Sequence, residues 1–178
     1  MRDEYDPDDY RLRERRRELR KLLPRDQNDV EAVRRLVDVG YPTVAPILSD
    51  LLKWIRGPEW PVCKPVAAFL VQIGEPLVPW LQRRLVRLDS RSLIGPLIGE
   101  VLPHWPREYI SPLTPFVEQE AIHGLYGNDL RALDLLVRKR LVSEDYAREL
   151  LASKRSFHQQ RVSELDSLAA LLSTDEAV

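Results

Sequence analysis

The chain has 178 residues, of which 44% are hydrophobic and 31% are charged, and its net charge is −1. This composition predicts a globular protein with one compact domain, and it gives no overall attraction to nucleic acid or to an anionic membrane. No apolar run reaches the roughly 18 residues of a membrane-spanning helix, and the N-terminus lacks the apolar segment of a signal peptide. The single cysteine, Cys63, cannot form an intramolecular disulfide, so we expect a cytoplasmic protein. Because no apolar run is long enough to span a membrane, we also expect no contact with a membrane.

The N-terminal residues 1–23 predict a charged helix that begins in an acidic segment with a proline, residues 6–9, and ends at Pro24. Glu14 and Glu18 lie at helical spacing from a set of arginines on this helix. We therefore interpret the arginine face as solvent-exposed rather than as a nucleic-acid-binding arm. The arginines of this face are Arg13, Arg15, Arg16, Arg17 and Arg20.

One short pattern occurs twice in the central part of the chain. Gly40 is followed two residues later by Pro42, and Gly74 is followed by Pro76 in the same way, about 34 residues further on. Glycine can adopt the left-handed conformation that ends one helix, and proline fits the first turn of the next. A period of this size, built from two helices, is typical of an α-solenoid. The helix that Gly74 ends is expected to begin at Trp60-Pro61.

Apolar residues at helical spacing predict about three stacked helical hairpins. The first helix of the first hairpin is expected to have Asn28 as its N-cap. The last helix begins at Trp105-Pro106, and Pro112 and Pro115 predict a late start or a kink in it. The most complete stripe, in the helix after Gly40, comprises Val44, Ile47, Leu48, Leu51, Leu52 and Ile55. The next stripes comprise Val62, Val66, Phe69, Leu70 and Ile73, then Leu77, Leu81, Leu85 and Leu88, then Ile94, Leu97, Ile98, Val101 and Leu102. No strand pattern occurs, so we expect an all-α protein in which neighbouring hairpins cover one another.

Two glycines, Gly124 and Gly127, predict a joint after the hairpins, and Asn128 or Asp129 is expected to cap the next helix. The stripe predicted for that helix comprises Leu130, Leu133, Val137 and Leu141. Ser143 is expected to cap a short helix bearing Tyr146, Leu150 and Leu151, and a separate last helix carries Val162, Leu165, Leu168, Ala169 and Leu172. The predicted division is an N-terminal charged helix, 1–23, a HEAT-like helical-repeat domain, 24–126, and a C-terminal helical extension, 127–178.

Several short motifs of the central region occur together in a known family. They are Leu22-Leu23-Pro24, Gly40-Tyr41-Pro42, Trp60-Pro61-Val62 and Ile73-Gly74-Glu75-Pro76. In these motifs the chain resembles an uncharacterised bacterial family of HEAT-like helical domains of unknown function, over about residues 22–120. The resemblance implies a short α-α superhelix of HEAT/ARM-like hairpins. It implies no activity, because the family has no assigned catalytic or binding residues.

Few residues are candidates for chemistry. His104, His123 and His158 lie on three different predicted elements, so they lack the spacing of a metal site. Cys63 lies beside Lys64 near a helix start, where a thiol pKa can fall, but its neighbours alternate with core positions and favour a structural role. The chain has no glycine-rich phosphate loop and no serine elbow. We therefore expect no catalytic residue, no metal and no cofactor, and a protein that is not an enzyme.

The tryptophans and a group of arginines give the predicted partner-binding surface. Trp60 and Trp105 each precede a proline, which favours packing onto the first turn of the following helix. Trp54 and Trp80 lie next to stripe positions, so either can face outward. The predicted partner-binding residues are Trp54, Trp80, Arg83, Arg84 and Arg87.

Three functional hypotheses follow from a solenoid without a catalytic site. Stacked hairpins form an extended surface that suits a large partner better than a small molecule, so the leading hypothesis is a module that binds another bacterial protein, of immunity or regulatory type. A second hypothesis is a nucleic-acid-binding HEAT-like protein that uses the same arginines with Arg138, Lys139 and Arg140, although such binding needs a coherent positive stripe. A third is a structural protein that forms a homodimer through its C-terminal helices.

Overall fold

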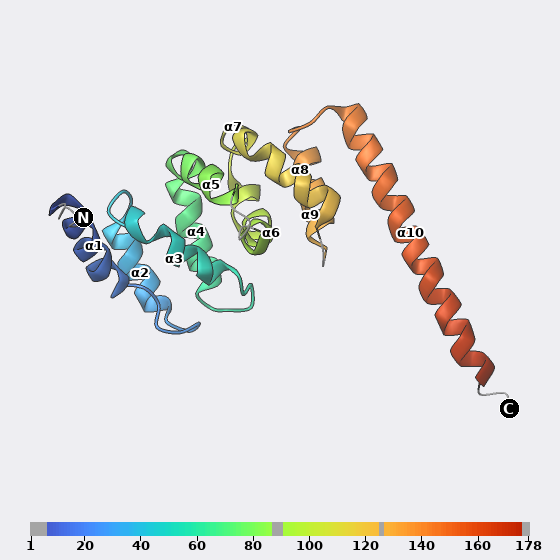
Figure 1. The fold of residues 1–178 in the computed structure, drawn as a ribbon, viewed down its shortest axis with the longest axis horizontal. Coiled ribbons are helices and arrows are strands. Elements are labelled where there is room, and N and C mark those ends of the chain that lie inside the picture. Colours follow the sequence, from blue (N-terminus) through green and yellow to red (C-terminus); the bar gives the residue numbers. More distant parts are fainter. Residues whose placement is uncertain (1–6, 87–90, 125–126, 176–178) are drawn as a thin grey trace, which may run out of the picture.

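The computed structural model describes residues 7–86, 91–124 and 127–175. Within these ranges every regular element is a helix and none is a strand, so the predicted all-α class is confirmed. The helices follow one another in chain order along an elongated molecule, and α1 (Pro7–Arg20) and the end of α10 (Glu144–Asp175) lie at opposite extremes (Figure 1). The superhelical repeat arrangement and the division into three parts stay predictions.

The first two helices are α1 (Pro7–Arg20) and α2 (Val30–Val39). The N-cap of α2 is Asp29, whose carboxylate accepts a hydrogen bond of 3.1 Å from the backbone N–H of Ala32. The predicted cap, Asn28, is therefore wrong by one residue. The backbone N–H of Asn28 instead donates to the side chain of Asp26 at 2.8 Å, which holds Asn28 in the preceding turn.

The segment after Gly40 buries the whole predicted stripe but is not one α-helix. It is divided into η1 (Ala45–Ile47), α3 (Leu48–Leu51) and η2 (Leu52–Ile55), in which η1 and η2 are 3-10 helices. Short 3-10 turns at helix ends are common because they satisfy terminal backbone groups, and Pro46 in η1 lacks an N–H to donate. All six stripe residues are at most 2% exposed.

The two repeated glycines have the backbone conformation that the sequence predicts. Gly40 (φ 70°) ends α2 and Gly74 (φ 64°) ends α4 (Cys63–Ile73). Their backbone N–H groups donate to the carbonyls of Leu36 and Leu70, respectively. After Gly74 come the 3-10 helix η3 (Glu75–Leu77) and α5 (Val78–Leu85). The expected start of α4 at Trp60-Pro61 is wrong, because Trp60 lies in a turn in which its N–H donates to the carbonyl of Gly57.

The third helical pair contains α6 (Arg91–Glu100), η5 (Leu102–His104), α7 (Arg107–Ile110), η6 (Ser111–Leu113) and α8 (Thr114–His123). Pro112 lies in η6 and Pro115 in the first turn of α8, so the expected interruption is present as a 3-10 turn between two short α-helices. The stripe residues predicted for this part are buried. Leu88 and Arg87 lie outside the described residues.

Two hydrogen bonds, each between residues 34 positions apart in the sequence, connect different parts of the core. The indole Nε1 of Trp105 donates to the carbonyl of Val71 at 3.2 Å, and Lys139 Nζ donates to the carbonyl of Trp105 at 2.7 Å. Each bond spans 34 residues. Tyr109 makes an edge-to-face contact with Trp105 at 6.3 Å, close to Gly74. These contacts join α4 to the segment before α7 and that segment to the end of α9 (Asn128–Arg138), each across the number of residues that separates Gly40 from Gly74.

Helix α9 (Asn128–Arg138) packs against α8 and α6 with a face that differs from the predicted one. Its N-cap is Gly127, at φ 82°, so neither Asn128 nor Asp129 is the cap. Leu130 and Val137 are exposed, whereas the buried face consists of Asp129, Ala132, Leu133, Leu135 and Leu136. The physical reason is that Asp129 forms a buried ion pair with Lys154 of the following helix, and this pair fixes the rotation of α9.

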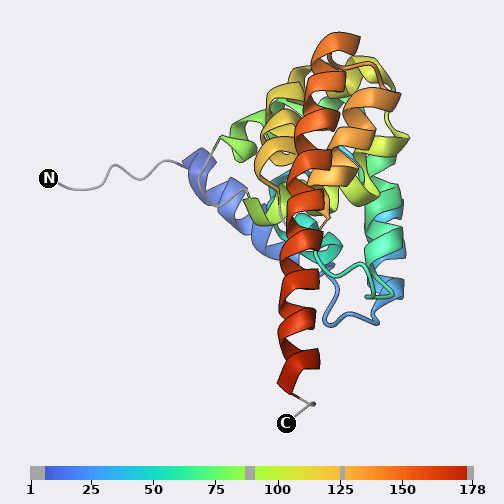
Figure 2. The ribbon, with the colours of Figure 1, turned by 90° about the vertical axis from the view of Figure 1, so that its right-hand side faces the viewer.

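The last element, α10 (Glu144–Asp175), is a single helix of 32 residues. The prediction of two helices is therefore wrong, and no glycine or proline interrupts this segment. The prediction that Ser143 caps this helix is confirmed, because its hydroxyl accepts a hydrogen bond from the N–H of Tyr146 at 3.3 Å. The first part of α10 packs against α9, and the rest extends beyond the body of the protein (Figures 1 and 2).

Candidate protein-binding surfaces

A small hollow lies between the end of α1 and the turn before α4. Its lining residues are Leu23, Pro24, Asp50, Lys53, Trp54 and Trp60, and its volume is about 310 Å³. We call it the tryptophan hollow. The rings of Trp54 and Trp60 meet edge to face, with centroids 6.2 Å apart and planes at 65°. Gly57 permits this arrangement, because a Cβ atom there would lie only 2.4 Å from the ring of Trp60.

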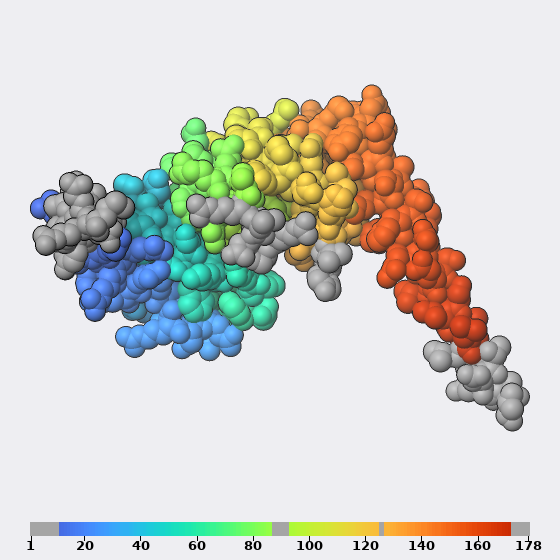
Figure 3. All heavy atoms as spheres, viewed as in Figure 1, coloured from blue at the N-terminus to red at the C-terminus, as the bar shows by residue number. Residues whose placement is uncertain are grey.

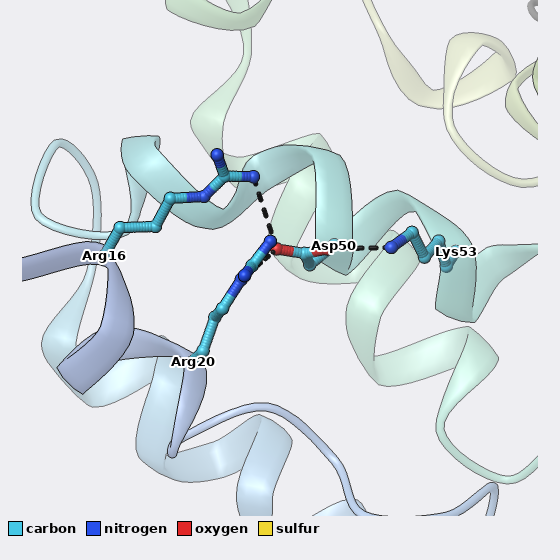
Figure 4. A network of polar contacts seen from close by, with 4 residues as sticks. All are labelled: Arg16, Arg20, Asp50 and Lys53. Carbon is cyan, nitrogen blue, oxygen red and sulfur yellow. Dashed lines mark hydrogen bonds and ion pairs between the residues drawn. The ribbon is translucent and has the colours of Figure 1, made fainter. Parts of the chain in front are cut away.

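A group of cationic side chains around Asp50, which we call the Asp50 cluster, lies beside the tryptophan hollow (Figure 4). The carboxylate of Asp50 accepts hydrogen bonds from Arg20 Nε at 2.9 Å and Lys53 Nζ at 2.8 Å, and Arg16 Nη2 lies 3.6 Å away. Asp50 is only 7% exposed. Burial raises the pKa of Asp50, but the hydrogen bonds from Lys53 and Arg20 outweigh it and hold the pKa below its usual value. Three cations thus surround one carboxylate, which leaves an excess of positive charge at the edge of the hollow.

The Asp50 cluster corrects the interpretation of the arginine face of α1. Arg16 and Arg20 still reach solvent, but they also bind a buried carboxylate on another helix, so this face fixes α1 to α3. Sequence spacing could not reveal this, because Arg20 and Asp50 are 30 residues apart.

The structure places the predicted partner-binding residues on two separate elements. Trp54 belongs to η2 and forms a wall of the tryptophan hollow. Trp80, Arg83 and Arg84 belong to α5, where Trp80 is half-buried against the core and Arg83 is exposed. Arg87 lies outside the described residues. The prediction missed Trp60, the second wall of the hollow, because a tryptophan before a proline equally fits packing inside the fold.

The basic segment of the nucleic-acid hypothesis is largely engaged within the protein. Arg138 Nε donates to Asp134 at 2.7 Å, and Lys139 donates to the carbonyl of Trp105. Arg138 and Lys139 also line a wide hollow of about 580 Å³ between α6 and α9, which contains the acidic residues Glu100 and Asp134 as well. The mixed charge of this hollow does not form a coherent positive stripe.

The second candidate surface is the part of α10 that projects from the body. From Arg155 to Leu171 every residue is exposed, and the space-filling view shows this part standing clear of the rest (Figure 3). Val162, Leu165 and Leu168 are 57%, 64% and 58% exposed. We call these three residues with Ala169 the tail strip, and residues 159–171 the tail. Leu172 belongs to the same predicted stripe, but its side chain lies outside the described residues.

The tail strip continues the face of α10 that packs on the body. Ala147, Leu150 and Lys154 face the body, and further steps of three or four residues along the helix lead to the tail strip. The same apolar face is therefore covered at its start and exposed at its end, because α8 and α9 do not extend far enough to cover it.

A buried ion pair anchors the first part of α10. Lys154 Nζ lies 3.1 Å from the carboxylate of Asp129 and donates to the carbonyl of Ile122 at 3.0 Å. His158 Nε2 lies 3.4 Å from the same carboxylate. Asp129 is 4% exposed, and burial raises its pKa, but the hydrogen bond and charge of Lys154 outweigh burial and hold the pKa below its usual value. The anchor fixes where the tail leaves the body.

Cys63 is a core residue. It is fully buried, and burial together with the charge of Glu100 raises its pKa to about 11. We expect it to react with an aqueous disulfide reagent at pH 8 only after the protein unfolds, because both exposure and thiolate are lacking in the folded state. A colour assay with and without denaturant measures this directly. Complete reaction of the native protein within seconds would contradict the buried placement.

Comparison with known proteins assigns the chain to a family. A family model described as a domain of unknown function, DUF5071, matches residues 22–129, which is more than half of the chain, so the chain belongs to this family. The resemblance to a family of unknown function is thereby confirmed, whereas bacterial origin and HEAT-like repeats stay predictions. No curated protein and no solved structure matches the chain. Among the described residues, none of the helices has both the length and the apolar content needed to cross a lipid bilayer.

Proposed function

We propose that the protein is a non-catalytic helical module that binds another protein through the tail of α10. The observation that carries the proposal is the tail strip, whose large apolar side chains are more than half exposed on a helix that leaves the body. Apolar side chains arranged at helical spacing along one exposed face are typical of helices that bind in a hydrophobic groove of a partner. A partner of immunity or regulatory type fits this proposal, since such a protein acts by contact alone.

Binding would also stabilise the tail itself. An isolated helical segment of this length is marginally stable in water, and most helix stability in proteins comes from packing an apolar face. A groove that covers the tail strip removes apolar surface from water at roughly 25 cal/mol per Å². The Asp129–Lys154 anchor holds the start of α10, so only the tail must become ordered on binding.

We further propose that the central region is a short HEAT-like array that supports the tail, and that the protein works in the cytoplasm. The bonds across 34 residues from Val71 to Trp105 and from Trp105 to Lys139 support the array, because equivalent positions of successive repeats contact one another in such folds. The buried, reduced Cys63 is compatible with a reducing compartment.

A pair of charge-adding variants tests the proposal. Leu165→Glu with Leu168→Glu places two carboxylates on the tail strip, and Ser163→Glu with Ser167→Glu places two on the opposite face of the same helix. We expect the first double variant to lose at least about tenfold in affinity for the bound protein, a loss of about 1.4 kcal/mol, and the second to keep wild-type affinity. Affinity capture after cross-linking in the cells that express the protein, followed by binding measurements with the identified partner, gives the comparison. Equal recovery with both double variants would contradict a binding role of the tail.

A further inference from the structure

The second half of α1 and the end of the sequence carry opposite charge, although the chain is nearly neutral overall. Residues 11–25 contain eight Lys and Arg residues and two Glu residues, whereas residues 162–178 contain four acidic residues and no basic ones. In the fold α1, which contains most of the basic segment, lies at one extreme and the end of α10 at the other (Figure 1). The net charge of −1 therefore conceals a local excess of positive charge in residues 11–25 and of negative charge after Arg161.

The tryptophan hollow lies at the basic end and has the chemistry of a receptor for an acidic, apolar helix. Trp54, Trp60 and Leu23 supply apolar walls, and tryptophan is among the residue types most enriched in binding hot spots. Arg16, Arg20 and Lys53 supply three cations against the single charge of Asp50. An occupant that fits must carry an apolar side chain with carboxylates next to it.

The tail meets this description within the same chain. Leu165, 64% exposed, lies between Asp166 and Glu164, which also pairs with Arg161 at 3.1 Å, and no basic residue follows Arg161. We infer that the tail of a second copy of this chain occupies the tryptophan hollow, with Leu165 and Leu168 against the tryptophans and Glu164 and Asp166 toward the cations. The inference rests on the proposed role of the tail as a binding element and names its partner.

The arrangement of the two sites permits a closed dimer. Each copy has one hollow and one tail at opposite ends of an elongated body, so two copies lying side by side in opposite directions can engage both sites at once. A two-fold axis relates the two contacts of such a dimer. Once the first contact holds the two copies together, the second forms within the same complex, so each contact strengthens the other. Pairing of two tails with each other would bring Glu164 and Asp166 of both copies together, which costs energy through like-charge repulsion.

The test reverses charges beside the hollow and on the tail of the whole chain, first separately and then together. Arg16→Glu reverses the charge of one cation beside the hollow and leaves Arg20 and Lys53 bound to Asp50. Glu164→Arg with Asp166→Arg reverses the charges next to Leu165 on the tail. We expect the wild type to be a dimer at low salt, each reversal alone to weaken it at least about tenfold, and the combination to restore affinity to within about threefold. Arg107→Glu, an exposed reversal on α7, is the matched control and should leave the dimer unchanged. Sedimentation velocity across a concentration series measures the masses, and thermal melting by circular dichroism verifies folding.

The outcomes separate this inference from the proposed function. A chain that stays monomeric at all concentrations overturns the inference, while the tail can still bind a different protein. A dimer that survives Arg16→Glu but is lost with Leu165→Glu and Leu168→Glu is a tail-to-tail dimer and also overturns it. Rescue by the combined reversal supports it, since a structural defect at Arg16 would not be repaired by changes on the tail.

Discussion

Trp105→Ala is expected to lower the free energy of unfolding by about 3–5 kcal/mol, the loss typical of truncating a large buried aromatic side chain. Trp105 is 1% exposed and belongs to the hydrophobic core. The substitution removes this ring from the core, together with the hydrogen bond to Val71 and the edge-to-face contact with Tyr109. Urea denaturation followed by circular dichroism measures the loss.

Trp105→Phe is the matched variant, because it keeps one aromatic ring in the core and removes the pyrrole ring with its N–H donor. We expect it to cost about 1–2 kcal/mol, mainly for the carbonyl of Val71 that loses its partner. If Trp105→Ala destabilised the protein no more than Trp105→Phe, the packing of the ring in the core would not contribute to stability as the burial of Trp105 implies.

Asp50→Ala is expected to cost about 2–3 kcal/mol, because it removes a buried carboxylate that holds Arg20 and Lys53. The pKa of Asp50 is lowered in the folded state, so its contribution is present above the unfolded pKa of about 3.9 and is lost as the pH falls through the folded value. The stability difference between the wild type and Asp50→Asn should therefore shrink steadily below about pH 4. Urea titrations from pH 7 to pH 2 measure this difference.

The control for Asp50 is Asp134→Ala, which breaks an exposed ion pair with Arg138. Exposed pairs contribute little, so we expect a much smaller loss than for Asp50→Ala. Equal losses for Asp50→Ala and Asp134→Ala would show that the Asp50 cluster does not fix α1 to α3.

The apolar periodicity predicted most of the core because burial in stacked helices acts at a fixed spacing. All six residues of the stripe that begins at Val44 are buried, even though the helix that carries them is divided by 3-10 turns. The glycine positions were predictable for a different reason. Gly40 and Gly74 both adopt positive φ, and few other residue types tolerate that conformation.

The errors arose where distant charges decide the structure. The rotation of α9 depends on Asp129, which is buried because Lys154 neutralises it from another helix. The apolar pattern alone placed Leu130 and Val137 inside, and both are exposed. Likewise, no local pattern indicates that Arg20 meets Asp50 or that Trp60 completes a hollow with Trp54.

Hydrogen exchange along α10 tests the central claim, that the tail is a binding element, most directly. In dilute protein the backbone amides of residues 159–171 should exchange quickly, because every residue of the tail is exposed, whereas the amides near Lys154 should be protected. In the protein bound to its partner, or concentrated if the partner is a second copy, the tail amides should become protected. Rapid exchange of the tail in every bound and concentrated state would contradict the account.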